Sequence, residues 1–206
     1  MDRIIFTLFL LLPFFQNVAG QKMQIGLIVD EGVDSKTIKL AIKEIEGYFN
    51  ANSRKIPNTI KLPKKFKRDT INAKALARYL QNEIHLLYFK NVYLTNKGIC
   101  LSDNFTYSTR GFATVGGKLA VVSTLVVRHE TSTQEEYESL MAKVLLHELA
   151  HLLGLRHCNS SDECMLVSSL PNPGKFYNAQ KALCKSCVDQ IGEKRIRKKH
   201  RNSKSR

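Results

Sequence analysis

The chain has no tryptophan, only five prolines, and far fewer acidic than basic residues. Its 206 residues include 32 lysines or arginines and 18 acidic side chains, which give a net charge of +14. Such an excess can indicate a polyanionic partner. The basic segment at residues 193–206 has neither aromatic residues interleaved with the basic ones nor a recognition-helix pattern, so we expect no nucleic-acid binding. We also find no internal repeat.

Long apolar segments are also missing. The one apolar run, residues 4–15, is shorter than the roughly 20 residues that a membrane-spanning helix needs. Arg3 precedes this run and small residues follow it at positions 18–20, an order typical of a signal peptide cleaved after Gly20. We therefore predict that residues 1–20 are a signal peptide. The mature chain is expected to be exported, either secreted or periplasmic, to have no membrane span, and to be a monomer.

Much of the positive charge lies at the end of the chain. Residues 193–206 hold eight lysines or arginines, one glutamate and almost no apolar side chains, so we predict a disordered basic tail. Two interpretations of this tail stay open: it is simply solvated, or it contacts an anionic surface or polymer. Residues 21–192 are enough for one core and are predicted to form one domain.

Three histidines and a glutamate follow one another at fixed spacing within eleven residues. They fill the pattern H-E-x-x-H-x-x-G-x-x-H as His147, Glu148, His151, Gly154 and His157. His147 and His151 would project from one face of a helix, where two imidazoles can form half of a tetrahedral zinc shell. Gly154 can adopt a positive φ and turn the chain so that His157 reaches the same metal. Three protein ligands leave one position open, as in catalytic zinc sites.

Glu148 follows a ligand directly and is placed to reach a zinc-activated water instead of the metal. In a peptidase, zinc lowers the pKa of its water to about 7, and Glu148 takes the proton and passes it to the leaving amine. The alternative is a zinc-stabilised peptide-binding module with little or no catalysis, although such a module has no need of Glu148. Hydrolysis of a non-peptide amide is a third hypothesis.

Periodicity along the chain predicts alternating strands and helices. Strands are expected at residues 23–29, 58–62, 84–94, 111–115 and 118–124. Helices are expected from Asp34 or Ser35, around residues 75–80, and after a capping box formed by Ser132 with Glu135 or by Thr133 with Glu136.

This order predicts an α/β fold of the α+β type. We expect a twisted, mostly parallel sheet packed on helices, one of which carries the histidines. Gly116-Gly117 predicts a hairpin, so one strand, residues 111–115, should be antiparallel and at the edge. An edge beside a metal-binding helix could accept an extended peptide, or the hairpin could only close the sheet.

Four of the five cysteines fall within thirty residues, starting directly after the third histidine. They are Cys158, Cys164, Cys184 and Cys187, and the last two form a C-x-x-C pair. From the residues alone they could form a closed, structural Cys₄ zinc site or, in an oxidising compartment, two disulfides. Cys100 lies apart in an apolar, strand-like segment and is predicted to be a buried, inert thiol.

The histidine motif, the cysteines and the run GGKLAVVST together resemble the archaemetzincins, zinc metallopeptidases of the metzincin clan. This resemblance implies two zinc ions per chain, a peptide or protein substrate, and Glu148 as the general base. The catalytic zinc would bind His147, His151 and His157. A structural zinc would bind the four cysteines in a compact C-terminal subdomain, and Met165 would form the Met-turn beneath the catalytic zinc. Some metzincins have a tyrosine where this chain has Val167, so no oxyanion helper is assigned, although Tyr177 could approach the site.

Overall fold

The structure is a computed structural model that describes residues 22–57, 60–83, 88–103, 108–168, 173–192 and 195–196. The predicted signal peptide and most of the predicted basic tail lie outside these residues. Two tail residues are described. Ile196 is fully buried and forms a bridge with Phe49, and the carbonyl of Arg195 accepts a hydrogen bond from the Asn50 amide. Arg195 and Ile196 therefore belong to the packed domain. Within the described ranges, no helix is long and apolar enough to cross a membrane.

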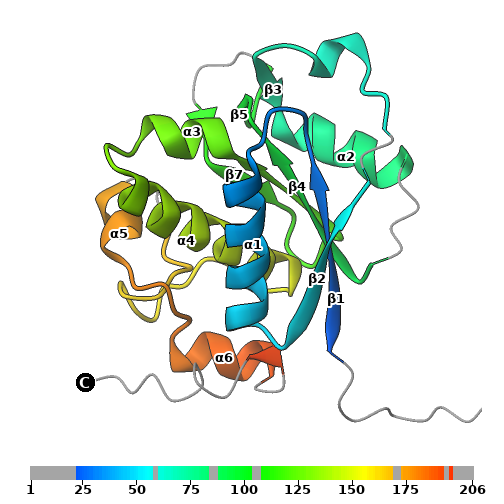
Figure 1. The fold of residues 1–206 in the computed structure, drawn as a ribbon. Helices are drawn as coiled ribbons and strands as arrows, with labels where there is room; N and C mark the ends of the chain where they lie inside the picture. The colour runs from blue at the N-terminus through cyan, green and yellow to red at the C-terminus, as the bar shows by residue number, and fades with distance from the viewer. Residues whose placement is uncertain are drawn as a thin grey trace, which may run out of the picture.

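A five-stranded sheet forms the centre of the molecule, in the order β2-β1-β4-β8-β7 (Figure 1). Its strands are β1 (Met23–Val29), β2 (Ala51–Ile56), β4 (Lys90–Thr95), β7 (Gly111–Ala113) and β8 (Leu119–Ser123). The pairs β1–β2, β1–β4 and β4–β8 are parallel, whereas β7 pairs with β8 in the antiparallel sense. The predicted fold class, with an antiparallel strand at the edge, is confirmed.

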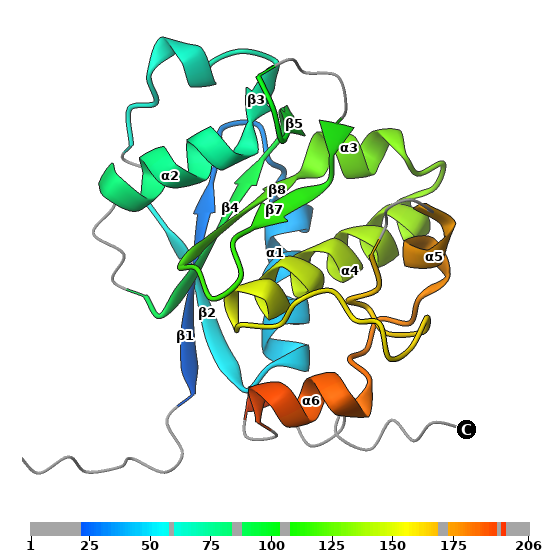
Figure 2. The same ribbon diagram turned by 180° about the vertical axis from the view of Figure 1, so that it is seen from behind.

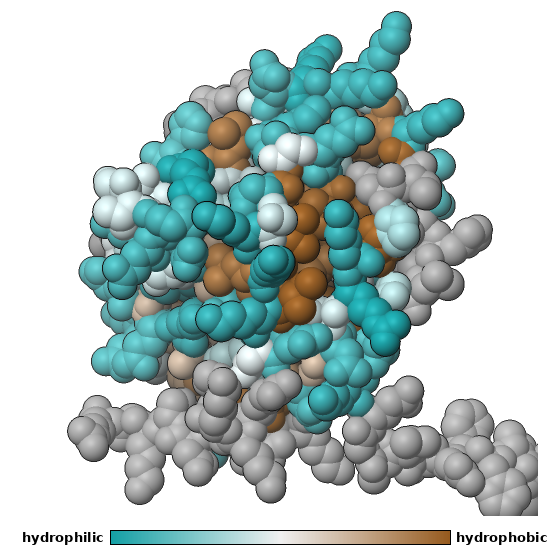
Figure 3. Space-filling model, in the orientation of Figure 1, coloured by the Kyte–Doolittle hydropathy of each residue, from teal (hydrophilic) through white to brown (hydrophobic). Residues whose placement is uncertain are grey.

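Helices cover both faces of this sheet (Figures 1 and 2). The helices α1 (Ser35–Tyr48) and α4 (Gln134–Leu152) pack on one face, and α2 (Ala73–Glu83) packs on the other. The core is divided accordingly, because successive strand residues point to opposite faces. In β4, for example, Val92 belongs to the cluster below α1 and α4, and Tyr93 to the cluster below α2. Hydrophilic residues cover most of the face shown in Figure 3, and an apolar area lies near its middle.

Shorter elements complete the fold. A second sheet contains β3 (Thr70–Asn72), β5 (Gly98–Cys100) and β6 (Ser108–Thr109). Short helices are η1 (Lys64–Phe66), α3 (Thr124–His129), α5 (Pro173–Asn178) and α6 (Lys185–Ile191). None of these short strands and helices was predicted, because segments of two to seven residues are too short to show a clear periodicity. Cys100 is buried in β5, as predicted.

Two predicted strands need correction. The strand expected at residues 58–62 lies instead at Ala51–Ile56, and residues 60–62 form no strand. Its sequence, ANSRKI, is mostly polar because β2 is an edge strand that buries Ala51 and Ser53 and exposes Asn52 and Arg54. The strand expected at 84–94 begins only at Lys90, and residues 84–87 lie outside the described ranges.

Candidate metal centres

The histidine motif occupies the C-terminal end of α4 and the turn that follows it. The Thr133 hydroxyl accepts a hydrogen bond from the Glu136 amide, and the Glu136 carboxylate accepts one from the Thr133 amide, so the second predicted capping box starts this helix. At the other end, Gly154 has a φ of 101°, and its amide donates to the carbonyl of His151. Gly154 thus ends the helix in the left-handed conformation, as predicted, and turns the chain toward His157.

The three histidine side chains converge. The Nε2 atoms of His147 and His151 lie 3.0 Å apart. The ring of His157 lies 4.9 Å from that of His151 and 5.4 Å from that of His147, measured between centroids. One ring nitrogen from each histidine lies within 4.8 Å of the others. His147 and His151 are buried, whereas His157 is exposed, so the site opens to solvent on the side of the third histidine.

Main-chain carbonyls fix the two buried rings. Nδ1 of His147 lies 2.7 Å from the carbonyl oxygen of Met165, and Nδ1 of His151 lies 2.8 Å from that of Leu155. A carbonyl only accepts hydrogen bonds, so each neutral ring carries its proton on Nδ1 and has a lone pair on Nε2. Two lone pairs that face each other repel unless a cation lies between them. Tetrahedral zinc with nitrogen ligands spaces them by about 3.3 Å, close to the spacing found here, so these residues fit zinc.

Burial also keeps the imidazoles in the form that binds metal. Desolvation is the main cause that lowers the pKa of all three, and neighbouring histidines add to it at His147 and His151. The pKa of His147 falls to about 3. The rings are therefore neutral near pH 7, and zinc would not have to displace protons from their Nε2 atoms.

Glu148 lies against the edge strand β7. Its side chain is buried, and a Cβ atom placed on Gly111 would lie 2.5 Å from its Oε1 atom. Burial raises the pKa of this carboxyl to about 8. A carboxyl with a pKa near neutrality can both take up and release a proton. The helix and the hairpin are also joined by a hydrogen bond from the Gly116 amide to the His151 carbonyl, 2.9 Å long.

A polar cluster borders the histidines on the side of α5. The ring of Phe176 packs edge-on against that of His147, with centroids 5.3 Å apart. Tyr177 follows Phe176 directly, and its hydroxyl accepts a hydrogen bond from Arg110 and donates one to Glu130, which also pairs with Arg110. The Tyr177 hydroxyl is thus engaged with these two partners.

Lys143 holds α5 against the metal-binding helix. It lies one turn before His147, is buried, and donates to the carbonyls of Phe176 and Tyr177 over 3.1 and 2.7 Å. Desolvation lowers its pKa. Sequence analysis did not identify Lys143, Arg110 or Phe176 as site residues. The one available signal was a lysine on the apolar side of a helix, flanked by Ala142 and Val144.

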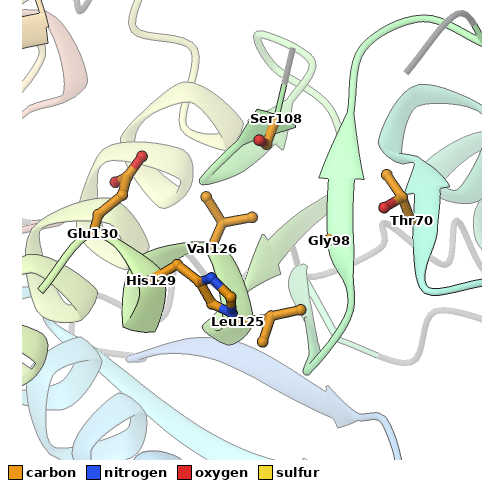
Figure 4. Close-up of a pocket in the computed structure, with 7 residues that line it drawn as sticks. All are labelled: Thr70, Gly98, Ser108, Leu125, Val126, His129 and Glu130. Atoms are coloured by element: carbon orange, nitrogen blue, oxygen red, sulfur yellow. The ribbon is translucent and has the colours of Figure 1, made fainter. Parts of the chain in front are cut away.

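A separate pocket of about 270 Å³ lies between α3 and the second sheet (Figure 4). Its lining residues are Thr70, Gly98, Ser108, Leu125, Val126, His129 and Glu130. None of the three motif histidines lines it. Glu130 is the residue that it shares with the polar cluster.

The four clustered cysteines also converge. The sulfur atoms of Cys158 and Cys184 lie 3.6 Å apart, those of Cys164 and Cys187 lie 3.8 Å apart, and all four lie within 4.8 Å of one another. A disulfide would bring two sulfurs to about 2.05 Å, whereas a tetrahedral zinc spaces them by about 3.8 Å. All five cysteines are free, so these residues fit a Cys₄ metal site.

The close approach of the thiols shifts their pKa values in opposite directions. A hydrogen bond with the Cys187 thiol lowers the pKa of Cys164 to about 5, and the same contact raises that of Cys187. The Cys184 amide also donates to the Cys164 sulfur over 3.4 Å. Met165 follows directly and is fully buried, and its carbonyl oxygen is the one that contacts His147. The two candidate centres are therefore joined by Cys164-Met165 as well as by His157-Cys158.

The three convergent histidines and the buried Glu148 fill the H-E-x-x-H-x-x-G-x-x-H pattern that is typical of metzincin-type metallopeptidases. Residues 78–193 match the family model of Peptidase family M54, and the chain belongs to this family.

Curated relatives agree with this assignment and with the resemblance to archaemetzincins. The chain is 31% identical to an archaemetzincin of Archaeoglobus fulgidus over 43% of its own length and 50% of that protein. It is 31% identical to an archaemetzincin of Natronomonas pharaonis over 46% of its length and 61% of that protein. The matches thus span about half of these relatives.

Two crystal structures show the same fold. Archaemetzincin from Methanopyrus kandleri superimposes with a TM-score of 0.68 at 22% identity, over 85% of this chain and 97% of that chain. Archaemetzincin from Archaeoglobus fulgidus, complexed with malonate, superimposes with a TM-score of 0.66 at 25% identity, over 82% of this chain and 99% of that chain.

Proposed function

We propose that the protein is a zinc-dependent metallopeptidase in which His147, His151 and His157 bind the catalytic zinc and Glu148 is the general base. One observation carries this proposal: the Nε2 atoms of His147 and His151 face each other over 3.0 Å while both Nδ1 atoms are held by carbonyls. Zinc at this position would supply a Lewis acid that activates a water and polarises a peptide carbonyl.

The chain's own residues would position the substrate and transfer the proton. The outer edge of β7 has no strand partner among the described residues, so an extended peptide could pair with it beside α4. Glu148 is buried against this strand, and its pKa of about 8 suits a group that takes a proton from water and gives it to the leaving amine. The substrate would therefore be an extended peptide or an unfolded segment of a protein.

We further propose a second, structural zinc bound by Cys158, Cys164, Cys184 and Cys187, which makes two ions per chain. The spacing of the sulfur atoms supports it. Four thiolate ligands leave no open position, so this ion would stabilise the fold without taking part in the reaction. Met165 would form the Met-turn, because it connects the two centres. Export after cleavage of a signal peptide stays a prediction from the sequence.

The decisive experiment replaces Glu148 by glutamine, which keeps the size of the side chain and removes its ability to take a proton. We expect cleavage of a peptide library, followed by mass spectrometry, to fall by about 10²–10⁴-fold while the zinc content is unchanged. Glu135→Gln, an exposed change on the first turn of the same helix, serves as the matched control.

Two outcomes would contradict the proposal. Wild-type rates in Glu148→Gln would remove Glu148 from the reaction. A zinc-loaded wild-type protein that binds the peptides but cleaves none, with or without a chelator, would favour the peptide-binding module instead.

A further inference from the structure

Gly111, the first residue of β7, is in direct contact with Glu148. A Cβ atom on Gly111 would lie 2.5 Å from Oε1, 2.6 Å from Cγ and 2.8 Å from Cδ of that glutamate. Real Cβ atoms essentially never approach other atoms so closely. The contact involves the middle of the glutamate side chain as well as its tip, so the side chain lies flat across the glycine. The two elements that carry these residues, β7 and α4, lie beside each other (Figure 2).

The backbone does not require glycine at this position. The described glycines with a positive φ are Gly32, Gly116, Gly154 and Gly192, and Gly111 is not among them. It is a strand residue paired with Val122, a conformation that alanine also adopts. What Gly111 provides is therefore the space that a Cβ atom would fill.

Neither element can easily move to make room for a larger residue. The strand is held by its pairing with β8, and the Arg110 carbonyl accepts a hydrogen bond from the Ser123 amide. The helix is held by its capping box and by the hydrogen bond from the Gly116 amide to the His151 carbonyl. A Cβ atom at position 111 would therefore displace the carboxylate of Glu148.

We propose that Gly111 is a positioning residue: its missing side chain forms the slot that keeps the Glu148 carboxylate in place for proton transfer. This proposal rests on the proposed role of Glu148. It predicts that a single methyl group on the edge strand impairs the reaction without touching a metal ligand.

The test compares Gly111→Ala with Gly47→Ala. Gly47 lies in α1 without a positive φ, and a Cβ atom there would meet nothing within 4 Å, so it is a matched control. We expect Gly111→Ala to keep the zinc content and KM of the wild type and to lose about 100-fold in kcat, the cost of a misplacement of about 1 Å. Gly47→Ala should behave like the wild type. Loss of zinc from Gly111→Ala, or a kcat within about twofold of the wild type, would overturn the proposal.

A second measurement does not depend on activity. The unfolding temperature is compared for wild type, Gly111→Ala, Glu148→Ala and the double variant. Because Glu148→Ala removes the atoms that collide with the new methyl group, Gly111→Ala should lower the unfolding temperature of the wild type but not that of Glu148→Ala. An equal fall in unfolding temperature in the wild type and in Glu148→Ala would show that the contact between Gly111 and Glu148 is not the cause. If the wild type cleaves no peptide, the proposed function fails, and this cycle still decides whether Gly111 positions Glu148.

Discussion

At the scale of single residues, main-chain atoms orient the candidate catalytic ligands. In many zinc sites a carboxylate accepts the outer N–H of the ligand imidazole, but here the carbonyls of Met165 and Leu155 do so. No side-chain substitution can remove these acceptors. The orientation of His147 and His151 therefore depends on the course of the backbone after α4.

The buried carboxyl of Glu148 should make the stability of the metal-free protein depend on pH. Its pKa is raised from 4.5 to about 8 by burial, so the unfolded chain loses this proton before the folded one does. Its contribution to stability is fully present below pH 4.5 and is lost as the pH rises toward 8. The loss reaches about 3 kcal/mol at pH 7. Glu148→Gln removes this dependence.

Chemical denaturation of metal-free wild type and Glu148→Gln at pH 5 and pH 7.5 measures the effect. The free energy of unfolding of Glu148→Gln, relative to that of the wild type, should be larger at pH 7.5 than at pH 5. The lowered pKa values of the histidines act in the opposite sense, against stability at acidic pH, but they are common to both proteins and cancel in the difference. An equal difference at both pH values would contradict the prediction.

At the scale of elements, α5 depends on one buried cation. Lys143→Met removes the donor to the carbonyls of Phe176 and Tyr177 while it keeps a similar side-chain length. We expect the free energy of unfolding to fall by about 1–3 kcal/mol. Peptide cleavage should also decrease, because Phe176 packs against the ring of His147.

Urea denaturation and a peptide-cleavage assay measure the two effects. The matched control is Lys175→Met on α5, whose exposed ammonium pairs with Asp162 on the surface and should contribute at most about 1 kcal/mol. Equal losses in the two variants would show that the buried contact of Lys143 has no special role.

The elements also show how far the sequence could predict this fold. Strands β1 and β8 and helices α1, α2 and α4 have clear apolar patterns, and their order predicted the type of sheet. The antiparallel edge was predicted from the Gly116-Gly117 turn. The edge strand β2 was misplaced because half of its short sequence faces solvent. The second sheet was missed because its strands pair only two or three residues each.

The candidate site likewise contains residues that the sequence predicted and residues that it did not. His147, His151 and His157 lie in one continuous segment, so spacing alone predicted their convergence. Arg110, Lys143 and Phe176 come from separate parts of the chain and have no motif. Their contacts depend on tertiary packing, which no local pattern records.

At the scale of the whole molecule, the cysteine cluster joins the turn after α4 to α6. Cys187→Ser should reduce the zinc content from two ions to one per chain. It should also lower the unfolding temperature by at least about 5 °C, since losing a structural ion removes several kcal/mol. The remaining zinc should stay with the histidines. Metal analysis by mass spectrometry and thermal unfolding measure both quantities.

Cys100→Ser is the control for this change, because Cys100 lies outside the cluster and is equally buried. It should keep both ions. One zinc per wild-type chain, together with four cysteines that resist thiol reagents, would instead favour two disulfides.

The two edges of the central sheet differ in charge. Edge strand β2 exposes Arg54 and Lys55, and like charges of this kind oppose the addition of a further strand. Edge strand β7, with the sequence GFA, has no charged residue. Among the described strands of the central sheet, β7 is therefore the edge that can more readily accept a strand from a second copy. A second copy seated there would occupy the edge that we propose for the substrate peptide, so aggregation by this route would compete with substrate binding.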